Sequence, residues 1–178
     1  MPEPDLRLVD RAALHREMDQ ACAELHRLVA TASRDDLRRG TRGTRWTNEQ
    51  LLYHMVFGYM IVRTLLPLVR TMSRLPDVVS RTFAATLNAG TRPFHVVNYL
   101  GSCGGALVFR GPRATAVLDR TIAALHRSLD AEREATLVRG MHFPVRWDPY
   151  FRDTMTIADV YHFGTQHFQH HLRQLTLT

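Results

Sequence analysis

Apolar residues recur at steps of three and four along four long segments of this 178-residue chain, and that period constrains the fold most. An amphipathic helix shows this spacing, whereas a half-buried strand alternates at every second residue, and no strong alternation of that kind occurs. In the first segment, from about residue 10 to 33, the repeating positions are Leu14, Met18, Ala21, Leu25 and Leu28. The pattern predicts an all-α protein.

Capping residues indicate where the second helix begins. Thr47, with Gln50 three residues later, forms a capping-box pattern. We expect the helix after it to continue at least through Thr64. Pro67 is a candidate kink in this helix, and Pro76 ends whatever follows.

Two further helices follow later in the chain. One opens at Pro112, because proline suits the first helical position, and it ends before Gly140. The last opens near Thr156, where Asp159 favours the amino-terminal end of the helix dipole, and it continues to about Leu175.

The segment between the second and third long helices, residues 77–110, is the hardest to interpret. Residues 77–89 are compatible with a short helix, residues 93–100 have mild strand character, and GSCGG at 101–105 predicts a loop or a close backbone approach. We interpret the whole segment as one long connection within a single domain that spans residues 1–178. Four long helices with such a connection predict a four-helix bundle with a crossover.

The composition limits the class of protein. No run of 18 apolar residues predicts a membrane span, and the first residues, MPEPDLRLVDRA, do not resemble a secretory signal. The two cysteines, Cys22 and Cys103, lie in unrelated contexts, so no disulfide framework is expected and the protein is predicted to be cytoplasmic.

The basic residues are all arginine, and they give a formal net charge of +6. Five of them gather between Arg34 and Arg45, either as a solvated interhelical loop or as a rim that binds a phosphate or carboxylate. No nucleic-acid motif accompanies them, so neither a nucleic acid nor a membrane is an expected partner.

Histidines interrupt two of the apolar stripes. His167 and His171 lie within the stripe of the last helix, about 40° apart around its axis and roughly 6 Å apart along it. His54 lies within the stripe of the second helix. Three inward-facing imidazoles each need a polar partner, and one divalent metal ion would satisfy all three while leaving a coordination position open. The alternative is that they are hydrogen-bonded core histidines.

The other histidines are assigned lesser roles. His170 is either a hydrogen-bond donor at the edge of this site or solvated, and His162 lies about 140° around the helix from His167, which excludes it as a ligand. We expect surface positions for His15, His26 and His126; His95 and His142 fall in connecting segments and are uninformative.

Two stretches resemble the DinB/YfiT-like superfamily. The stretch WTNEQLLYHM, residues 46–55, is similar to the family's second-helix motif, and HFQHHLRQL, residues 167–175, is similar to its closing HxxHH motif. The resemblance, closest to actinobacterial members, implies that His54, His167 and His171 bind a divalent metal ion. It favours zinc, with nickel, iron or manganese as alternatives, in a four-helix bundle that forms a homodimer.

The family resemblance also suggests activities. Members include S-transferases and isomerases that use mycothiol or bacillithiol, and proposed metal-dependent hydrolases. Our leading hypothesis is a metal-dependent enzyme that activates a thiol for a small-molecule substrate. Hydrolysis is less favoured because no Asp or Glu lies on either histidine stripe, and a non-catalytic metal-binding or stress-response protein is the third option.

Several further residues are candidates without an assigned role. Cys103 is a candidate fourth ligand, although a free loop thiol is the simpler interpretation, and Cys22 is expected in the core. Tyr53, Tyr161 and His170 are candidates for proton transfer, and none is placed by sequence alone.

Overall fold

The computed structural model describes residues 9–177 of the chain, and most of them are helical. The elements follow in the order α1 (Arg11–Thr31), α2 (Arg34–Arg38), α3 (Asn48–Met72), α4 (Asp77–Ala89), α5 (Thr91–Val108), α6 (Pro112–Asp130), α7 (Glu134–Leu137), β1 (Gly140–His142), β2 (Thr154–Thr156) and α8 (Ile157–Leu172). The predicted all-α class is confirmed, apart from one short pair of strands.

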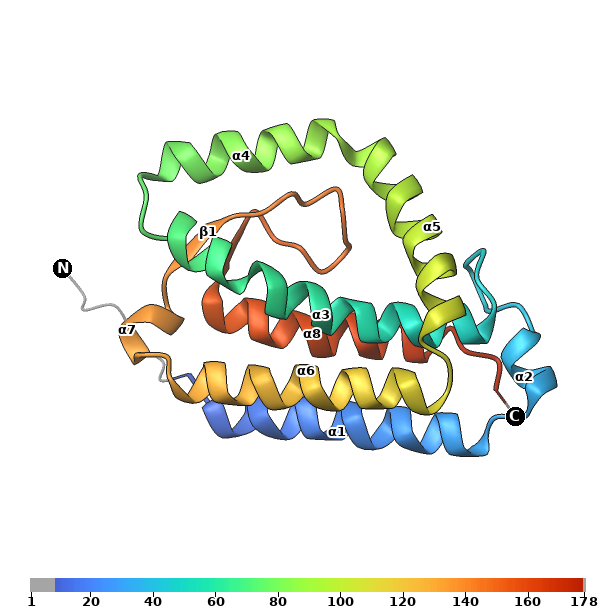
Figure 1. The fold of residues 1–178 in the computed structure, drawn as a ribbon. Coiled ribbons are helices and arrows are strands. Elements are labelled where there is room, and N and C mark those ends of the chain that lie inside the picture. Colours follow the sequence, from blue (N-terminus) through green and yellow to red (C-terminus); the bar gives the residue numbers. More distant parts are fainter. Residues whose placement is uncertain (1–8, 178) are drawn as a thin grey trace.

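The core lies between α1, α3, α6 and α8 (Figure 1). Helix α1 packs against α6 and α8, and α3 packs against the same two helices from the other side. Their inward faces supply most of the buried apolar side chains, among them Met18, Leu25, Tyr59, Leu118, Leu125 and Phe168. The apolar stripes read from the sequence are therefore the core-facing sides of these helices.

The predicted capping signals define the ends of two central helices. Thr47 accepts from the backbone N–H of Gln50, whose side chain in turn accepts from the backbone N–H of Thr47. Thr156 and Asp159 form the same reciprocal pair at the start of α8. Helix α3 continues through Pro67 to its end at Met72, past the proposed kink.

Helix α3 is also the one helix of residues 9–177 that is long and apolar enough to span a membrane. However, 56% of its most apolar 18-residue window is buried inside the protein. Its apolar character is that of the central helix of a core, which fits the expected non-membrane protein.

The segment 77–110 agrees with the prediction in its first part, where α4 is the short helix expected at 77–89. Its second part differs: instead of mild strand at 93–100 and a loop at 101–105, the chain forms the helix α5. The two helices leave the end of α3 and return towards its beginning (Figure 1). Helix α5 packs on α3, where a Cβ at Gly105 would lie 2.1 Å from a ring carbon of Tyr53. Gly105 therefore allows close helix packing, and this tertiary contact outweighs its poor helix propensity.

Two short strands were not predicted. β1 and β2 pair antiparallel, with Met141 opposite Met155, and α4 packs against β1. His142, which the sequence left without a role, is buried in β1, and its ring nitrogens contact Asp77 and Asp153. The pair ties the start of α4 to the connection that precedes α8.

Candidate metal centre

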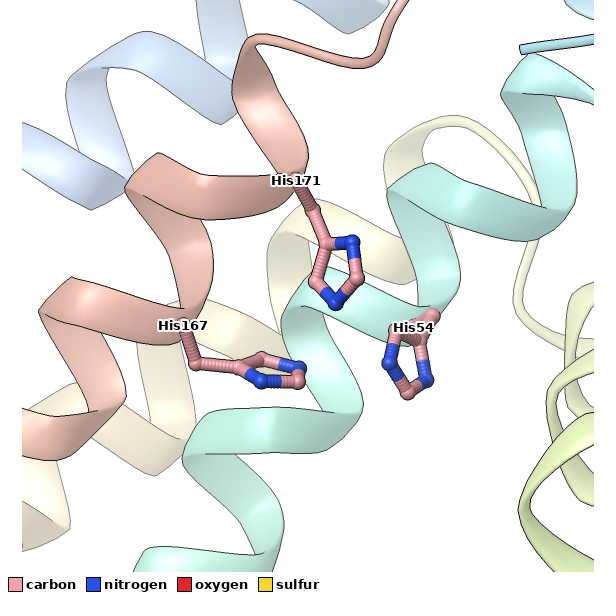
Figure 2. A group of neighbouring side chains, drawn as sticks. All are labelled: His54, His167 and His171. Carbon is pink, nitrogen blue, oxygen red and sulfur yellow. The ribbon is translucent and has the colours of Figure 1, made fainter. Parts of the chain in front are cut away.

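The three histidines selected from the sequence come together between α3 and α8. His54 is on α3, and His167 and His171 are on adjacent turns of α8; their rings point towards one another in Figure 2. One nitrogen from each ring lies within 4.8 Å of the other two. Their exposed fractions are 3%, 7% and 8%, so all three are buried.

The approach of the two helices depends on glycine. A Cβ at Gly58 of α3 would lie only 2.4 Å from Cδ2 of His167. Reciprocally, a Cβ at Gly164 of α8 would lie 2.7 Å from the ring of Tyr59 on α3. Both glycines fall on apolar stripes, and each leaves room for a ring from the opposite helix.

Each histidine is oriented through its Nδ1 atom by a side chain from a different part of the chain. His54 Nδ1 lies 2.9 Å from Ser102 Oγ, on α5. His167 Nδ1 lies 3.1 Å from Asp148 Oδ2, in the β1–β2 connection. His171 Nδ1 lies 2.7 Å from Gln174 Oε1, just beyond α8.

These partners fix the tautomers. A carboxylate and an amide oxygen only accept, so His167 and His171 carry their proton on Nδ1. The Ser102 hydroxyl donates to the carbonyl of Asn98, at 2.8 Å, so its oxygen accepts from His54 Nδ1–H. In the neutral form, all three rings therefore keep the Nε2 lone pair available.

One of these Nε2 atoms has no protein partner. Among residues 9–177, His167 Nε2 is the only buried side-chain nitrogen or oxygen without a hydrogen bond. Such a group costs free energy unless something else binds it. A zinc site is typically built from imidazole nitrogens whose rings hydrogen-bond to an acceptor through their second nitrogen. These three histidines have that arrangement, so they fit a divalent ion.

Burial keeps the rings of His54 and His171 neutral. Desolvation, and then the charges of His167 and His171, lower the pKa of His54 well below its usual range. Desolvation similarly lowers the pKa of His171 to about 4, and the neighbouring His167 adds to the shift. The metal-binding form of both residues is thus the stable one at neutral pH.

Asp148 remains ionised despite its burial. Desolvation raises its pKa, but the hydrogen bond and charge of His167 outweigh that effect and lower the pKa overall. The same carboxylate accepts from the backbone N–H of Tyr150 at 2.9 Å. Asp148 therefore adds one negative charge beside the cluster, on the Nδ1 side of His167.

An aromatic wall borders the cluster on one side. The Trp46 ring stacks on His54, with centroids 4.4 Å apart, and meets His171 edge-on at 6.2 Å. Tyr99 of α5 stacks on the same indole at 5.9 Å, and the exposed Arg45 guanidinium lies 4.9 Å from the Tyr99 ring centroid. This side of the cluster is apolar at the rings and cationic at the rim.

The remaining candidates from the sequence lie at varied distances from the cluster. His170 contacts Tyr150 and Gln174, at 3.3 Å each, so it supports the side chain that orients His171. His162, which the sequence analysis excluded as a metal ligand, contacts Glu17 of α1 instead. Cys103 lies on α5 and is not among the residues that form the described cluster.

The proposed proton-transfer tyrosines are engaged elsewhere. The Tyr161 hydroxyl donates to Ser128 and lies beside Arg70. Tyr53 stacks on Phe109, with centroids 5.7 Å apart, and burial raises its pKa. Neither belongs to the three-histidine cluster.

Sequence patterns missed the three orienting residues. Ser102 lay in a stretch interpreted as loop, Asp148 in an irregular connector, and Gln174 near the end of the chain. Only the spacing of Gln174, three residues after His171, held a signal, because residues three apart lie on one helical face.

A family model described as the DinB superfamily matches residues 17–175, which is most of the chain. No curated protein and no solved structure gives a significant match.

Proposed function

The chain belongs to the DinB superfamily, and from that premise we propose that it is a metal-dependent enzyme that activates a low-molecular-weight thiol, of the S-transferase or isomerase type. The observation that carries the proposal is the set of three fixed tautomers, which directs neutral imidazoles at one point and includes an unpartnered nitrogen on His167. In this proposal α1, α3, α6 and α8 are the family's four-helix bundle, with α4 and α5 as its crossover.

His54, His167 and His171 would hold the ion, with zinc expected first and nickel, iron or manganese as alternatives, because imidazole suits several of these metals. A divalent ion there would lower the pKa of a bound thiol or water, and so supply a nucleophile at neutral pH. Three protein ligands leave a position for that molecule.

The surrounding residues favour a thiol substrate with an anionic or polar tail. Trp46 and Tyr99 provide stacked apolar surface beside the histidines, which excludes water from one side. Arg45, at the rim of that surface, has no acidic partner among the described residues. Its guanidinium is suited to a carboxylate or a sugar hydroxyl of a substrate such as mycothiol or a similar thiol.

Two alternatives are less well supported. Hydrolysis needs a general base beside the open position, but the nearby carboxylate, Asp148, is bound to His167 Nδ1 and to the Tyr150 backbone. A purely structural metal site requires a fourth protein ligand. Within the described residues, the cluster has three.

Thiol binding to the cobalt-loaded protein tests the proposal directly. Titration with mycothiol should produce a sulfur-to-cobalt charge-transfer absorption in the wild type and in the exposed-site control His95→Ala. The band should be absent in His54→Ala, whose fold is checked by circular dichroism. The proposal is overturned if the thiol leaves the spectrum unchanged, and if an electrophile panel yields no S-adduct above the His54→Ala background.

A further inference from the structure

A second group of histidines and carboxylates lies between α1 and α6. Neither helix carries a member of the three-histidine cluster, His54, His167 and His171, which is called the triad below. His15 and Asp19 are four residues apart on α1, and His126 and Asp130 are four residues apart on α6. Residues with this spacing share a helical face. Because the two helices run in opposite directions (Figure 1), each histidine lies opposite the aspartate of the other helix.

The hydrogen bonds cross between the helices. His15 Nε2 lies 2.9 Å from Asp130 Oδ1, and His126 Nε2 lies 2.9 Å from Asp19 Oδ1. The two Nδ1 atoms are in direct contact. The ring centroids are 4.6 Å apart and the planes are within 22° of parallel.

These contacts determine the protonation of the group. Both carboxylates accept, so both Nε2 atoms carry hydrogen, and each neutral ring would then direct its Nδ1 lone pair at the other. Two facing lone pairs repel unless a cation lies between them. That cation is a proton, which makes one ring an imidazolium, or a metal ion.

We propose that His15 and His126 form a second metal site, in which a divalent ion binds both Nδ1 atoms and displaces the proton that they share. A histidine ligand usually has its other nitrogen held by a carboxylate, and Asp130 and Asp19 occupy that role for both rings. Imidazole nitrogen selects zinc, copper or nickel over magnesium or calcium. The proposal is independent of the function of the triad.

The side chains have room to accept an ion. Nitrogen–metal bonds of about 2.0–2.1 Å require the Nδ1 atoms to separate. The side chains of His15 and His126 are 26% and 23% exposed, and their aspartates 67% and 70%, so each pair has an open side towards which it can move. The nearby Glu17 is already paired with His162, at 2.7 Å, and is not counted as a ligand.

The same pair of helices offers a matched control. His26 of α1 contacts Asp119 of α6 at 2.9 Å through Nε2, and no second imidazole is described against its ring. Replacing His26 therefore removes a similar contact between the helices without changing the paired rings.

Counting bound zinc in the full-length protein tests the site. After equilibration with zinc and removal of free ion, wild type and His26→Asn should hold two ions per chain, and His126→Asn should hold one. A double variant of the triad, His54→Asn with His171→Asn, should keep one ion. Calorimetry of this variant in buffers of different ionisation enthalpy should show that about one proton is released as the ion binds.

A double triad variant that binds no zinc overturns the proposal, whether or not the triad itself holds an ion in the wild type. Equal zinc content in wild type and His126→Asn also overturns it. His15→Asn provides a second route should His126→Asn fail to fold, and it must show the same loss of one ion.

Discussion

At the scale of single residues, the triad depends on three side chains that contact its rings on the Nδ1 side, away from the proposed metal position. Ser102, Asp148 and Gln174 each contact an Nδ1 atom, and they come from α5, the β1–β2 connection and the segment after α8. Because they hold the proton on Nδ1, they leave the Nε2 lone pair of each ring available to bind a metal ion. Loss of an outer partner of this kind typically lowers metal affinity or activity by about 10- to 100-fold.

Asp148→Ala should therefore weaken metal binding by about 10- to 100-fold, because His167 would lose the acceptor that fixes its tautomer and the nearby negative charge. Chelator competition on the purified protein measures the change. Asp153→Ala, in the same connection, serves as the control, since Asp153 contacts His142 instead. Equal affinities for the two variants would refute the orienting role.

Buried neutral histidines make the metal-free protein sensitive to acid. The unfolded chain takes up a proton near the ordinary histidine pKa of 6.5, whereas His171 in the folded protein does so only at about 4. The stabilisation that His171 gives is complete above pH 6.5 and is lost as the pH falls towards 4, by about 3 kcal/mol.

Urea unfolding of the chelated protein between pH 7.5 and 4 measures this loss. His171→Asn should show a shallower decline in unfolding free energy than the wild type, while His95→Asn should follow the wild type. Parallel curves for His171→Asn and the wild type would contradict the expected linkage.

At the scale of elements, the site exists because α3 and α8 approach closely at two glycines. Gly58 faces the ring of His167, and Gly164 faces the ring of Tyr59. Each glycine thus accommodates a ring of the opposite helix, and the histidine pair on α8 reaches the histidine on α3.

Gly58→Ala should displace His167, because the new Cβ would lie 2.4 Å from its Cδ2 atom. We expect at least about a tenfold loss of metal affinity, the size found for disturbed outer partners of a metal. Gly101→Ala in α5 is the control: its Cβ meets nothing within 4 Å. That control should keep the affinity and raise stability by about 0.5–1 kcal/mol. Unchanged metal affinity in Gly58→Ala would show that the His167 ring can move away from the new Cβ without loss of binding, which would contradict the prediction.

The sequence was sufficient for elements whose signals are local. The capping pairs at Thr47 and Thr156 start α3 and α8 as predicted, and helical spacing alone brought His167 and His171 onto one face. Helix α5 was not predicted because its glycines suit a loop in isolation, and the reason for Gly105, its contact with Tyr53, exists only in the folded protein. Pairing across helices was likewise hidden: His15 and His126, expected at the surface, are partly buried against each other.

At the scale of the whole molecule, the α4–α5 arm connects the fold to the site. Its first helix is held to β1 through His142 and Asp77, and its second helix supplies Ser102 to His54. The region interpreted from the sequence as a connection therefore contributes to the orientation of a ligand. It also carries Tyr99 at the rim, where a substrate would pass.

The predicted homodimer stays a prediction. We propose the outer side of α5 as its interface, since this helix has no Asp, Glu or Arg between Phe94 and Val108 and exposes Val97, Leu100 and Leu107 by 69%, 59% and 66%. Contiguous exposed apolar surface of this kind marks an interaction site. Light scattering on the purified protein measures whether two chains associate.

We propose that the buried cluster of His54, His167 and His171 holds a divalent ion, and elemental analysis of the purified protein tests this. Purified wild-type protein and the control His95→Ala should contain metal at the triad, and His171→Ala should lose that ion. The same metal content in His171→Ala as in the wild type would contradict the account.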